Sequence, residues 1–282
     1  MSEFHRKPVT YVGEVSINVL NLENALIFYE EVIGFRILNK TERKAVLTTD
    51  GKTPLLTLVQ PGDVIPKEGR TSGLYHFALL LPTRADLAVF LRHLLATQYP
   101  FGAADHGVSE ALYITDPDGN GIEVYYDRPS LEWEWTNGEV KMVTEQLDGN
   151  SILAESDAAW SGLSAGTLMG HIHLHVANLQ DTEEFYVSGL GFKIVTRYDG
   201  ALFTSTGGYH HHIGLNIWNG IGAPTPKKNS VGLNWFTLVY ADEAARNKVI
   251  GQLKEMGAKV SLEGEEYIVT DPSGNEIHLV IL

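Results

Sequence analysis

The chain has 282 residues, 44% of them hydrophobic and 20% charged, so it is long enough for about two globular domains. Its formal net charge of -14 argues against binding to nucleic acid, because phosphate backbones are neutralised by Lys and Arg. The chain has no Cys, no apolar run of the ~20 residues that a membrane span needs and no signal-peptide pattern, which excludes disulfides and predicts a cytoplasmic protein with a small-molecule partner.

The elements predicted in chain order form a βαβββ unit. Alternating apolar residues over 14–19 predict a strand with one polar face. A helical apolar stripe follows over 22–33, with Asn21 as its N-cap and Gly34 at its end. Three strands are predicted next, over residues 35–38, 45–49 and 55–60. The same order restarts with a strand at 75–81, a helix near 84–96 and strands up to residue 126.

Three segments of the first half recur in the second half, in the same order. Residues 12–37 align without a gap to 169–194, and 72–80 align to 231–239. The Asp-Pro-x-Gly-Asn turn at 116–120 recurs at 271–275. This regular spacing indicates a duplication. We therefore predict an α+β protein of tandem domains, 1–130 and 165–282, joined by an ordered linker, 131–164, with two paired βαβββ units per domain.

Paired βαβββ units with an Asp-Pro-x-Gly-Asn turn and a following Glu resemble the vicinal oxygen chelate superfamily, which includes glyoxalase I, extradiol dioxygenases and bleomycin-resistance proteins. The two-domain layout is most similar to its bacterial catechol-2,3-dioxygenase-type members. The resemblance implies that each pair of units forms a curved mixed sheet around a cleft, whose polar concave face holds a divalent metal. The ligands would lie on the first strand of each unit and on the last strand.

In the first half, the resemblance places Glu14, His76 and Glu123 at these three positions. All three occupy polar phases of otherwise apolar strands. Two buried carboxylates side by side would be costly without a cation, which a metal would offset. The resemblance favours Fe(II), and a set of one His and two Glu would also accept Mn, Ni or Zn.

The segment 106–123 resembles the extradiol dioxygenase signature, through His106, Tyr113, the turn and Glu123. In that family, this His and Tyr lie beside the bound diol. An imidazole can pass a proton at neutral pH, so His106 and Tyr113 are the candidate catalytic residues.

Two departures bear on this prediction. Extradiol enzymes use two His and one carboxylate, whereas Glu14 stands where the first His is expected, and a further His expected near the oxygen is missing from 52–58. In the second half the three ligand positions hold His171, Trp235 and His278, which predicts a second domain without the first domain's metal site. An alternative is a separate Zn site in that half, formed by His171, His212 and His278.

Three functions are compatible with these residues. The first is a metal-dependent extradiol dioxygenase that cleaves an aromatic diol. The second is a glyoxalase-type lyase or isomerase, in which a non-redox metal polarises a hydroxy-carbonyl substrate. The third is a metal-free protein that binds an aromatic compound or confers resistance to it. A monomer and a homodimer are both compatible with the sequence.

Overall fold

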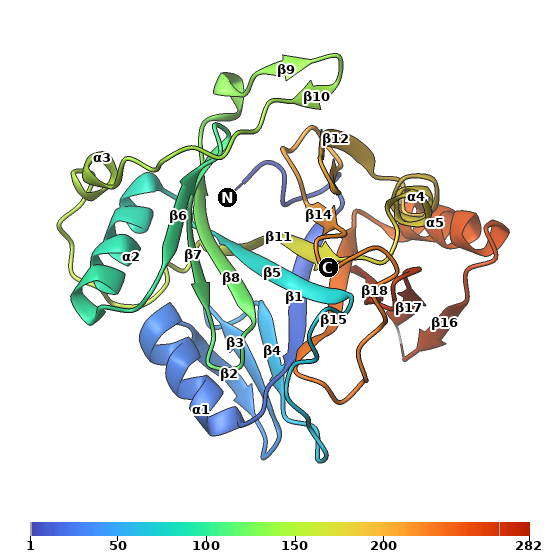
Figure 1. Cartoon of the computed structure of the whole chain (residues 1–282), viewed down its shortest axis with the longest axis horizontal. Coiled ribbons are helices and arrows are strands. Elements are labelled where there is room, and N and C mark those ends of the chain that lie inside the picture. The colour runs from blue at the N-terminus through green and yellow to red at the C-terminus, as the bar shows by residue number, and fades with distance from the viewer. Residues whose placement is uncertain (1, 265) are drawn as a thin grey trace.

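Four βαβββ units make up most of the chain in the computed structural model, which describes residues 2–264 and 266–282 (Figure 1). The first unit consists of β1 (Tyr11–Asn18), α1 (Leu22–Ile27) continued by the π-helical turn η1 (Phe28–Ile33), β2 (Arg36–Lys40), β3 (Lys44–Thr48) and β4 (Leu56–Val59). The second consists of β5 (Gly73–Leu80), α2 (Arg84–Thr97), β6 (Gly102–Asp105), β7 (Ser109–Thr115) and β8 (Gly121–Asp127).

The second half repeats this order after a linker. The linker contains η2 (Ser130–Glu132), the hairpin of β9 (Trp135–Thr136) and β10 (Glu139–Val140), and α3 (Gly149–Leu153). The third unit consists of β11 (Leu168–His175), α4 (Leu179–Glu183), η3 (Glu184–Gly189), β12 (Lys193–Tyr198), β13 (Ala201–Ser205) and β14 (Ile213–Asn216). The fourth consists of β15 (Gly232–Tyr240), α5 (Glu243–Glu255), β16 (Val260–Glu263), β17 (Glu266–Thr270) and β18 (Glu276–Ile281). The α+β class and the repeated βαβββ order are therefore as expected.

The sheets combine units from both halves of the chain, which corrects the expected pairing within each half. The strand order of the first sheet is β16-β17-β18-β15-β1-β4-β3-β2, so it contains the first and fourth units; we call it sheet I. The order of the second is β12-β13-β14-β11-β5-β8-β7-β6, so it contains the second and third units; we call it sheet II. Antiparallel pairing of β1 with β15, and of β5 with β11, makes these joints. The sequence repeats alone could not indicate which units pair.

The two Asp-Pro-x-Gly-Asn turns connect the sheets. The Asp116 carboxylate accepts hydrogen bonds from the backbone N–H and the side-chain amide of Asn120 (2.8 and 2.9 Å), and from the hydroxyl of the buried Tyr29 on η1 (2.9 Å). In the second copy, Asp271 is bound in the same way by Asn275 and accepts from the Tyr186 hydroxyl at 3.0 Å. Each turn thus joins a strand end of one sheet to a helix of the other.

Local sequence signals place the helices as predicted. The Asn21 side chain accepts from the backbone N–H of Asn24, and Gly34 ends η1 with φ of 92°. The helical segments pack against the sheets (Figure 1), and apolar strand residues such as Val15 and Ile17 are fully buried. Among the helices of the described chain, none is both long and apolar enough to span a bilayer.

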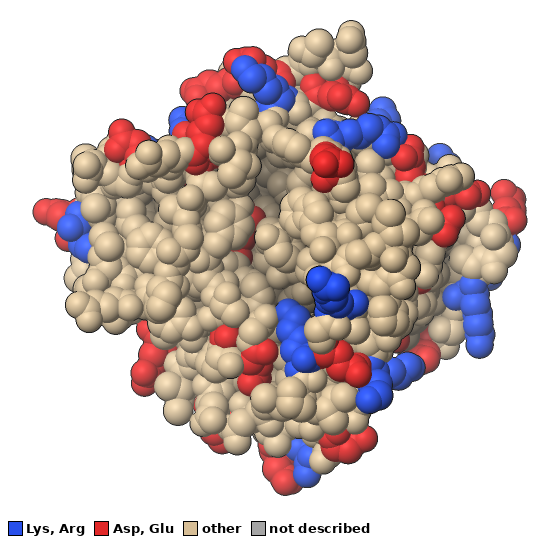
Figure 2. Space-filling model, viewed as in Figure 1, with Lys and Arg blue, Asp and Glu red and all other residues tan. Residues whose placement is uncertain are grey.

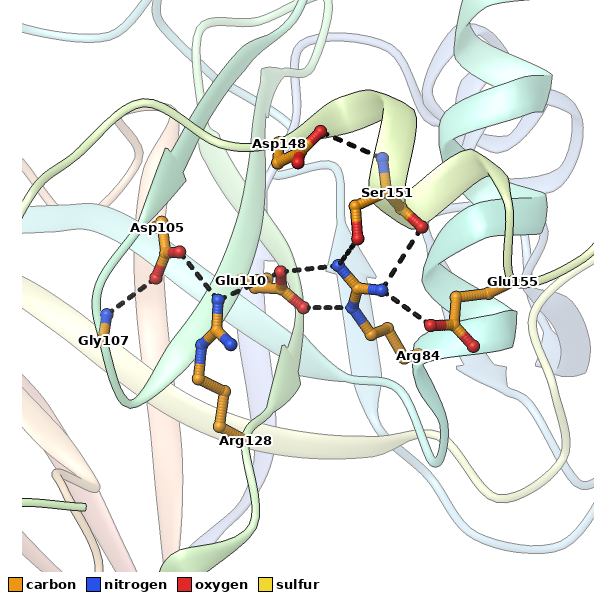
Figure 3. Close-up of polar contacts among 8 residues, drawn as sticks. All are labelled: Arg84, Asp105, Gly107, Glu110, Arg128, Asp148, Ser151 and Glu155. Carbon is orange, nitrogen blue, oxygen red and sulfur yellow. Dashed lines mark hydrogen bonds and ion pairs between the residues drawn. The ribbon is translucent and has the colours of Figure 1, made fainter. Parts of the chain in front are cut away.

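The linker is attached to the second unit by ion pairs around Glu110, a buried residue of β7 (Figure 3). Arg84 donates to both carboxylate oxygens of Glu110 (2.7 and 3.0 Å), and Arg128 donates to Glu110 at 3.2 Å and to Asp105 at 2.7 Å. The Arg84 guanidinium also binds the linker through Glu155 at 2.7 Å. Paired in this way, the buried carboxylate keeps its charge compensated and fixes α3 against α2.

Candidate metal centre and its cavity

Three buried side chains meet on the concave face of sheet II: His76 on β5, Glu123 on β8 and His171 on β11. Residues directly opposite one another on neighbouring strands point to the same face of a sheet. Ala78 is the register partner of both Glu123 and His171, and its small side chain leaves room between them. His76 is on the same face two residues earlier. The cluster therefore follows from the joint between the second and third units.

The ligand atoms of this cluster are close enough to hold one ion. The Nε2 atoms of His76 and His171 each lie 3.1 Å from Oε2 of Glu123, and the three potential ligand atoms all lie within 4.8 Å of one another. His76 Nε2 is buried and makes no hydrogen bond of acceptable geometry. A buried polar atom without a partner is costly, and a cation would give it one. Two imidazoles and a carboxylate thus fit a divalent metal.

The electrostatics of the cluster also favour the protonation states in which these side chains bind a metal. Burial alone would raise the pKa of Glu123, but the hydrogen bond from His171 and the attraction of the His171 and His76 imidazoles outweigh it and hold that pKa well below its usual range. Burial lowers the pKa of His171. At neutral pH the cluster therefore presents a carboxylate and at least one neutral imidazole, the forms that bind metals.

His106 and Tyr113 lie together at the wall of the same cavity. His106 Nδ1 donates to the carbonyl of Val143 (2.7 Å), since a carbonyl can only accept, which leaves Nε2 of the neutral ring as an acceptor. The Tyr113 hydroxyl lies 2.6 Å from that Nε2 and donates to it. Burial, with the nearby charge of Glu123, raises the pKa of Tyr113 well above its usual value and keeps the hydroxyl protonated. The linker thereby sets the tautomer of His106.

A second chain of hydrogen bonds orients His211 at the cavity wall. Asp127 accepts from Nε2 of His210 at 2.7 Å, and Nδ1 of His210 lies 2.8 Å from Nδ1 of His211, so one of these two nitrogens donates to the other. The His211 ring lies against His171, with centroids 4.1 Å apart, and burial lowers its pKa well below the usual value. His211 is therefore a neutral base next to the cluster.

These residues line a cavity of about 550 Å³. Figure 2 shows the molecule hollowed near the centre of the view, with a rim formed mainly by uncharged residues. The metal cluster supplies His76 and Glu123 to the lining, and the remaining polar groups include His106, Tyr113 and His211. A concave space with a candidate metal cluster and several proton-transfer groups is the usual form of a catalytic pocket.

The structure does not bring Glu14 to His76 and Glu123, which corrects the expected ligand set. Glu14 is on β1 of sheet I, lines a different cavity and accepts a hydrogen bond from Thr57 at 2.5 Å. His171 takes its place because β11, and not β1, is the neighbour of β5.

The alternative site of His171, His212 and His278 is not assembled either. His278 is on sheet I, where its ring stacks on that of Trp235 with centroids 4.7 Å apart. Its Nδ1 lies 2.6 Å from Oε2 of Glu266. The His212 Nε2 atom donates to the carbonyl of Phe4 at 3.0 Å. Each of these imidazoles already has its own partners, and His171 and His278 lie on strands of different sheets, whereas His212 precedes β14.

Sequence reasoning missed the membership of His171 in this cluster and the position of His211. A signal for both was present, since His171 aligns with Glu14 in the repeat and the run 210–212 precedes the last strand of the third unit. The third unit thus has histidines just before its last strand, where the first unit has none.

The chain is similar in sequence to known proteins. A family model described as the Glyoxalase/Bleomycin resistance protein/Dioxygenase superfamily matches residues 11–124 and 168–279. The catechol-2,3-dioxygenase of Bacillus subtilis (strain 168) is 44% identical over 278 residues, which cover 96% of this chain and 98% of that protein. Biphenyl-2,3-diol 1,2-dioxygenase 3 of Rhodococcus globerulus is 30% identical over 118 residues, 40% of this chain and 62% of that protein.

A similar fold is found among solved structures. Glyoxalase I from Zea mays has a TM-score of 0.55 to this chain, at 17% sequence identity, over 96% of this chain and 92% of that structure. At this identity the likeness concerns the fold alone.

Proposed function

We propose that this chain, which belongs to the Glyoxalase/Bleomycin resistance protein/Dioxygenase superfamily, is a metal-dependent extradiol dioxygenase that opens the ring of a catechol-type aromatic diol. One observation carries the proposal: two buried imidazoles and one carboxylate converge at a cavity that also contains His106, Tyr113 and His211. The similarity to a catechol-2,3-dioxygenase over nearly the whole chain supports it.

His76, His171 and Glu123 would hold the metal. Two His and one carboxylate form the set that suits Fe(II) with open positions. When bound, the ion would supply positions for the two diol oxygens and for molecular oxygen. Mn(II), Ni(II) and Zn(II) are alternative occupants that metal analysis would distinguish.

The residues around the cluster would bind the diol and move its protons. His106 accepts a proton from a diol hydroxyl at Nε2, the atom left unprotonated by the bond from Nδ1 to Val143. A bound diol would take the place of His106 Nε2 as the acceptor of the Tyr113 hydroxyl, which stays protonated and orients the diol as a hydrogen-bond donor. His211 would offer a second neutral imidazole on the side of His171, where it could accept or return a proton next to the cluster. The buried walls exclude bulk water from these transfers.

An oxygen-uptake assay of Fe(II)-loaded protein with catechol tests the proposal. We expect one molecule of oxygen to be consumed for each catechol, with both of its atoms in the ring-opened product. His106→Ala should lower turnover by about 10²–10⁴-fold, the usual share of acid–base catalysis. His278→Gln is the matched control, because it alters a histidine of sheet I at the position that corresponds to Glu123. Metal-dependent turnover of a hydroxy-carbonyl without oxygen uptake would instead support the lyase, and tight diol binding by metal-free protein the binding function.

Two further expectations belong to this proposal. A cytoplasmic location follows from the lack of Cys and is tested by cell fractionation. The chain is expected to be a monomer or a homodimer, and light scattering distinguishes the two because their masses differ twofold.

A further inference from the structure

The cavity at the metal centre has more room than unsubstituted catechol needs. A cavity of about 150 Å³ is enough to hold benzene, whereas this one measures about 550 Å³. The extra space lies beyond the ion cluster, between two walls of different chemistry. A substituent on the ring of the diol would occupy that space.

One wall is made of small residues and the other of aromatic ones. Gly102, Ala103 and Ala104 of β6 contribute no side chain larger than a methyl group. Opposite them the aromatic wall runs from the interior to the rim, through Phe203, Tyr198, Trp218 and Tyr75. The rings of Trp218 and Tyr75 pack edge to face with centroids 5.4 Å apart, and those of Tyr198 and Phe203 pack in the same way with centroids 5.9 Å apart. Such rings bind flat or apolar groups strongly.

The charges around the cavity disfavour an anionic substituent. Among the residues that the structure describes, no Lys or Arg lines this cavity. Lys67 lies outside the lining, and its ammonium group is held by the carbonyl of Gly119 at 2.8 Å. Besides Glu123, the lining contains one more carboxylate, the exposed Asp199 at the rim. A carboxylate on the substituent would lose water, find no Lys or Arg in the lining to pair with and face Asp199.

Resting on the proposed function, we infer that this site selects catechols with an uncharged apolar substituent, alkyl or aryl, and discriminates against those with an anionic side chain. Trp218 and Asp199 are the residues that set this preference. The Trp218 indole is held in place by its hydrogen bond to the carbonyl of Asp199 (3.4 Å), so the two act at the same part of the rim.

Four diols test the inference: catechol, 4-propylcatechol, 3,4-dihydroxyphenylacetamide and 3,4-dihydroxyphenylacetate. The last two have nearly the same shape and differ in charge. We expect kcat/KM for propylcatechol to exceed that for catechol by about tenfold or more, as for other apolar groups that fill a pocket. We expect the acetate to fall below the amide by about tenfold or more, because its charge is uncompensated.

Two variants assign these preferences to the rim. Trp218→Ala should lower the propylcatechol-to-catechol ratio by about threefold or more, whereas Trp135→Ala, an exposed Trp outside the cavity, should leave the ratio unchanged. Asp199→Lys should raise the acetate-to-amide ratio by about tenfold, whereas Asp157→Lys, the same charge change on the linker, should not.

The outcomes separate this inference from the proposed function. Turnover of catechol with equal rates for acetate and amide would overturn the inference and leave the dioxygenase in place. If no diol is turned over, calorimetry can still measure the affinity of metal-loaded protein for each of the same four diols and so reveal the preference. Binding in the order propylcatechol, amide, acetate supports the inference, and any order that places the acetate above the amide overturns it.

Discussion

Replacing His171 by Gln should remove metal binding, whereas replacing Glu14 by Gln should not. A ligand that binds only the folded state stabilises it by RT ln(1 + [L]/Kd), which is about 2.7 kcal/mol at a metal concentration of 100 Kd. The three potential ligand atoms of His76, Glu123 and His171 converge within 4.8 Å, so the loss of one removes a third of the set. If the affinity falls about 100-fold, the same metal concentration stabilises the variant by only about 0.4 kcal/mol.

The assay is thermal unfolding of each protein with and without Mn(II), with each variant compared to its own metal-free form. This comparison removes the effect of losing the bond between His171 and Glu123 in the metal-free state. For a chain of this size, 2.7 kcal/mol corresponds to a rise in Tm of about 5–10 °C, and 0.4 kcal/mol to about 1 °C. Glu14→Gln should keep the full rise, because Glu14 is on sheet I and binds Thr57. A blunted rise in Glu14→Gln with a full rise in His171→Gln would refute the assignment.

Three more results are expected. Tyr29→Phe and Tyr186→Phe should each lower the free energy of unfolding by about 1.5–3 kcal/mol in denaturant titrations, because each removes a buried hydrogen bond to a carboxylate; a loss below 0.5 kcal/mol would contradict this. Burial lowers the pKa of His5 to about 4, so below about pH 6.5 the unfolded chain binds a proton that the folded chain does not, and the free energy of unfolding should fall with decreasing pH down to about pH 4. His5 contributes up to about 1.4 kcal/mol per pH unit to this fall in the free energy of unfolding. His5→Phe should reduce the slope of the free energy of unfolding against pH by this amount. Residues 1–130 and 165–282 expressed separately should fail to show cooperative unfolding, because β1–β15 and β5–β11 join the halves; two independently folded fragments would contradict the shared sheets.

The units and their local signals could be predicted from the sequence. The strand periodicity, the Asn21 cap and the Gly34 end depend on neighbouring residues, and all three are found in the structure. The resemblance of the 106–123 segment to the extradiol signature selected His106 and Tyr113, and both line the cavity, but the hydrogen bond between them was not predicted.

The pairing of the units could not be predicted in this way. Whether β5 pairs with β1 or with β11 depends on contacts between segments about 100 residues apart, and both candidates have the same strand pattern because they are copies of each other. The ligand set changes with that choice, from Glu14 to His171. The bond from His106 to Val143 was also inaccessible, since it depends on how the aperiodic linker folds back on β6.

The two copies of the Asp-Pro-x-Gly-Asn turn differ in the residue that follows because the turn and the metal centre depend on different things. Asp116 and Asp271 make the same bonds to Asn and Tyr, so the turn is retained wherever a helix of one sheet must be joined to the other sheet. Glu123 faces two imidazoles on sheet II, whereas His278, at the matching position of sheet I, stacks on Trp235 and binds Glu266. Trp235 stands where His76 stands in the other sheet, so no ligand set remains there and a carboxylate at 278 would be buried without a cation. At this position His278 has two carboxylate partners, Glu266 and Glu276, which meet the local charge requirement. Within the described residues the metal cluster lies on sheet II, so sheet I is free of that constraint.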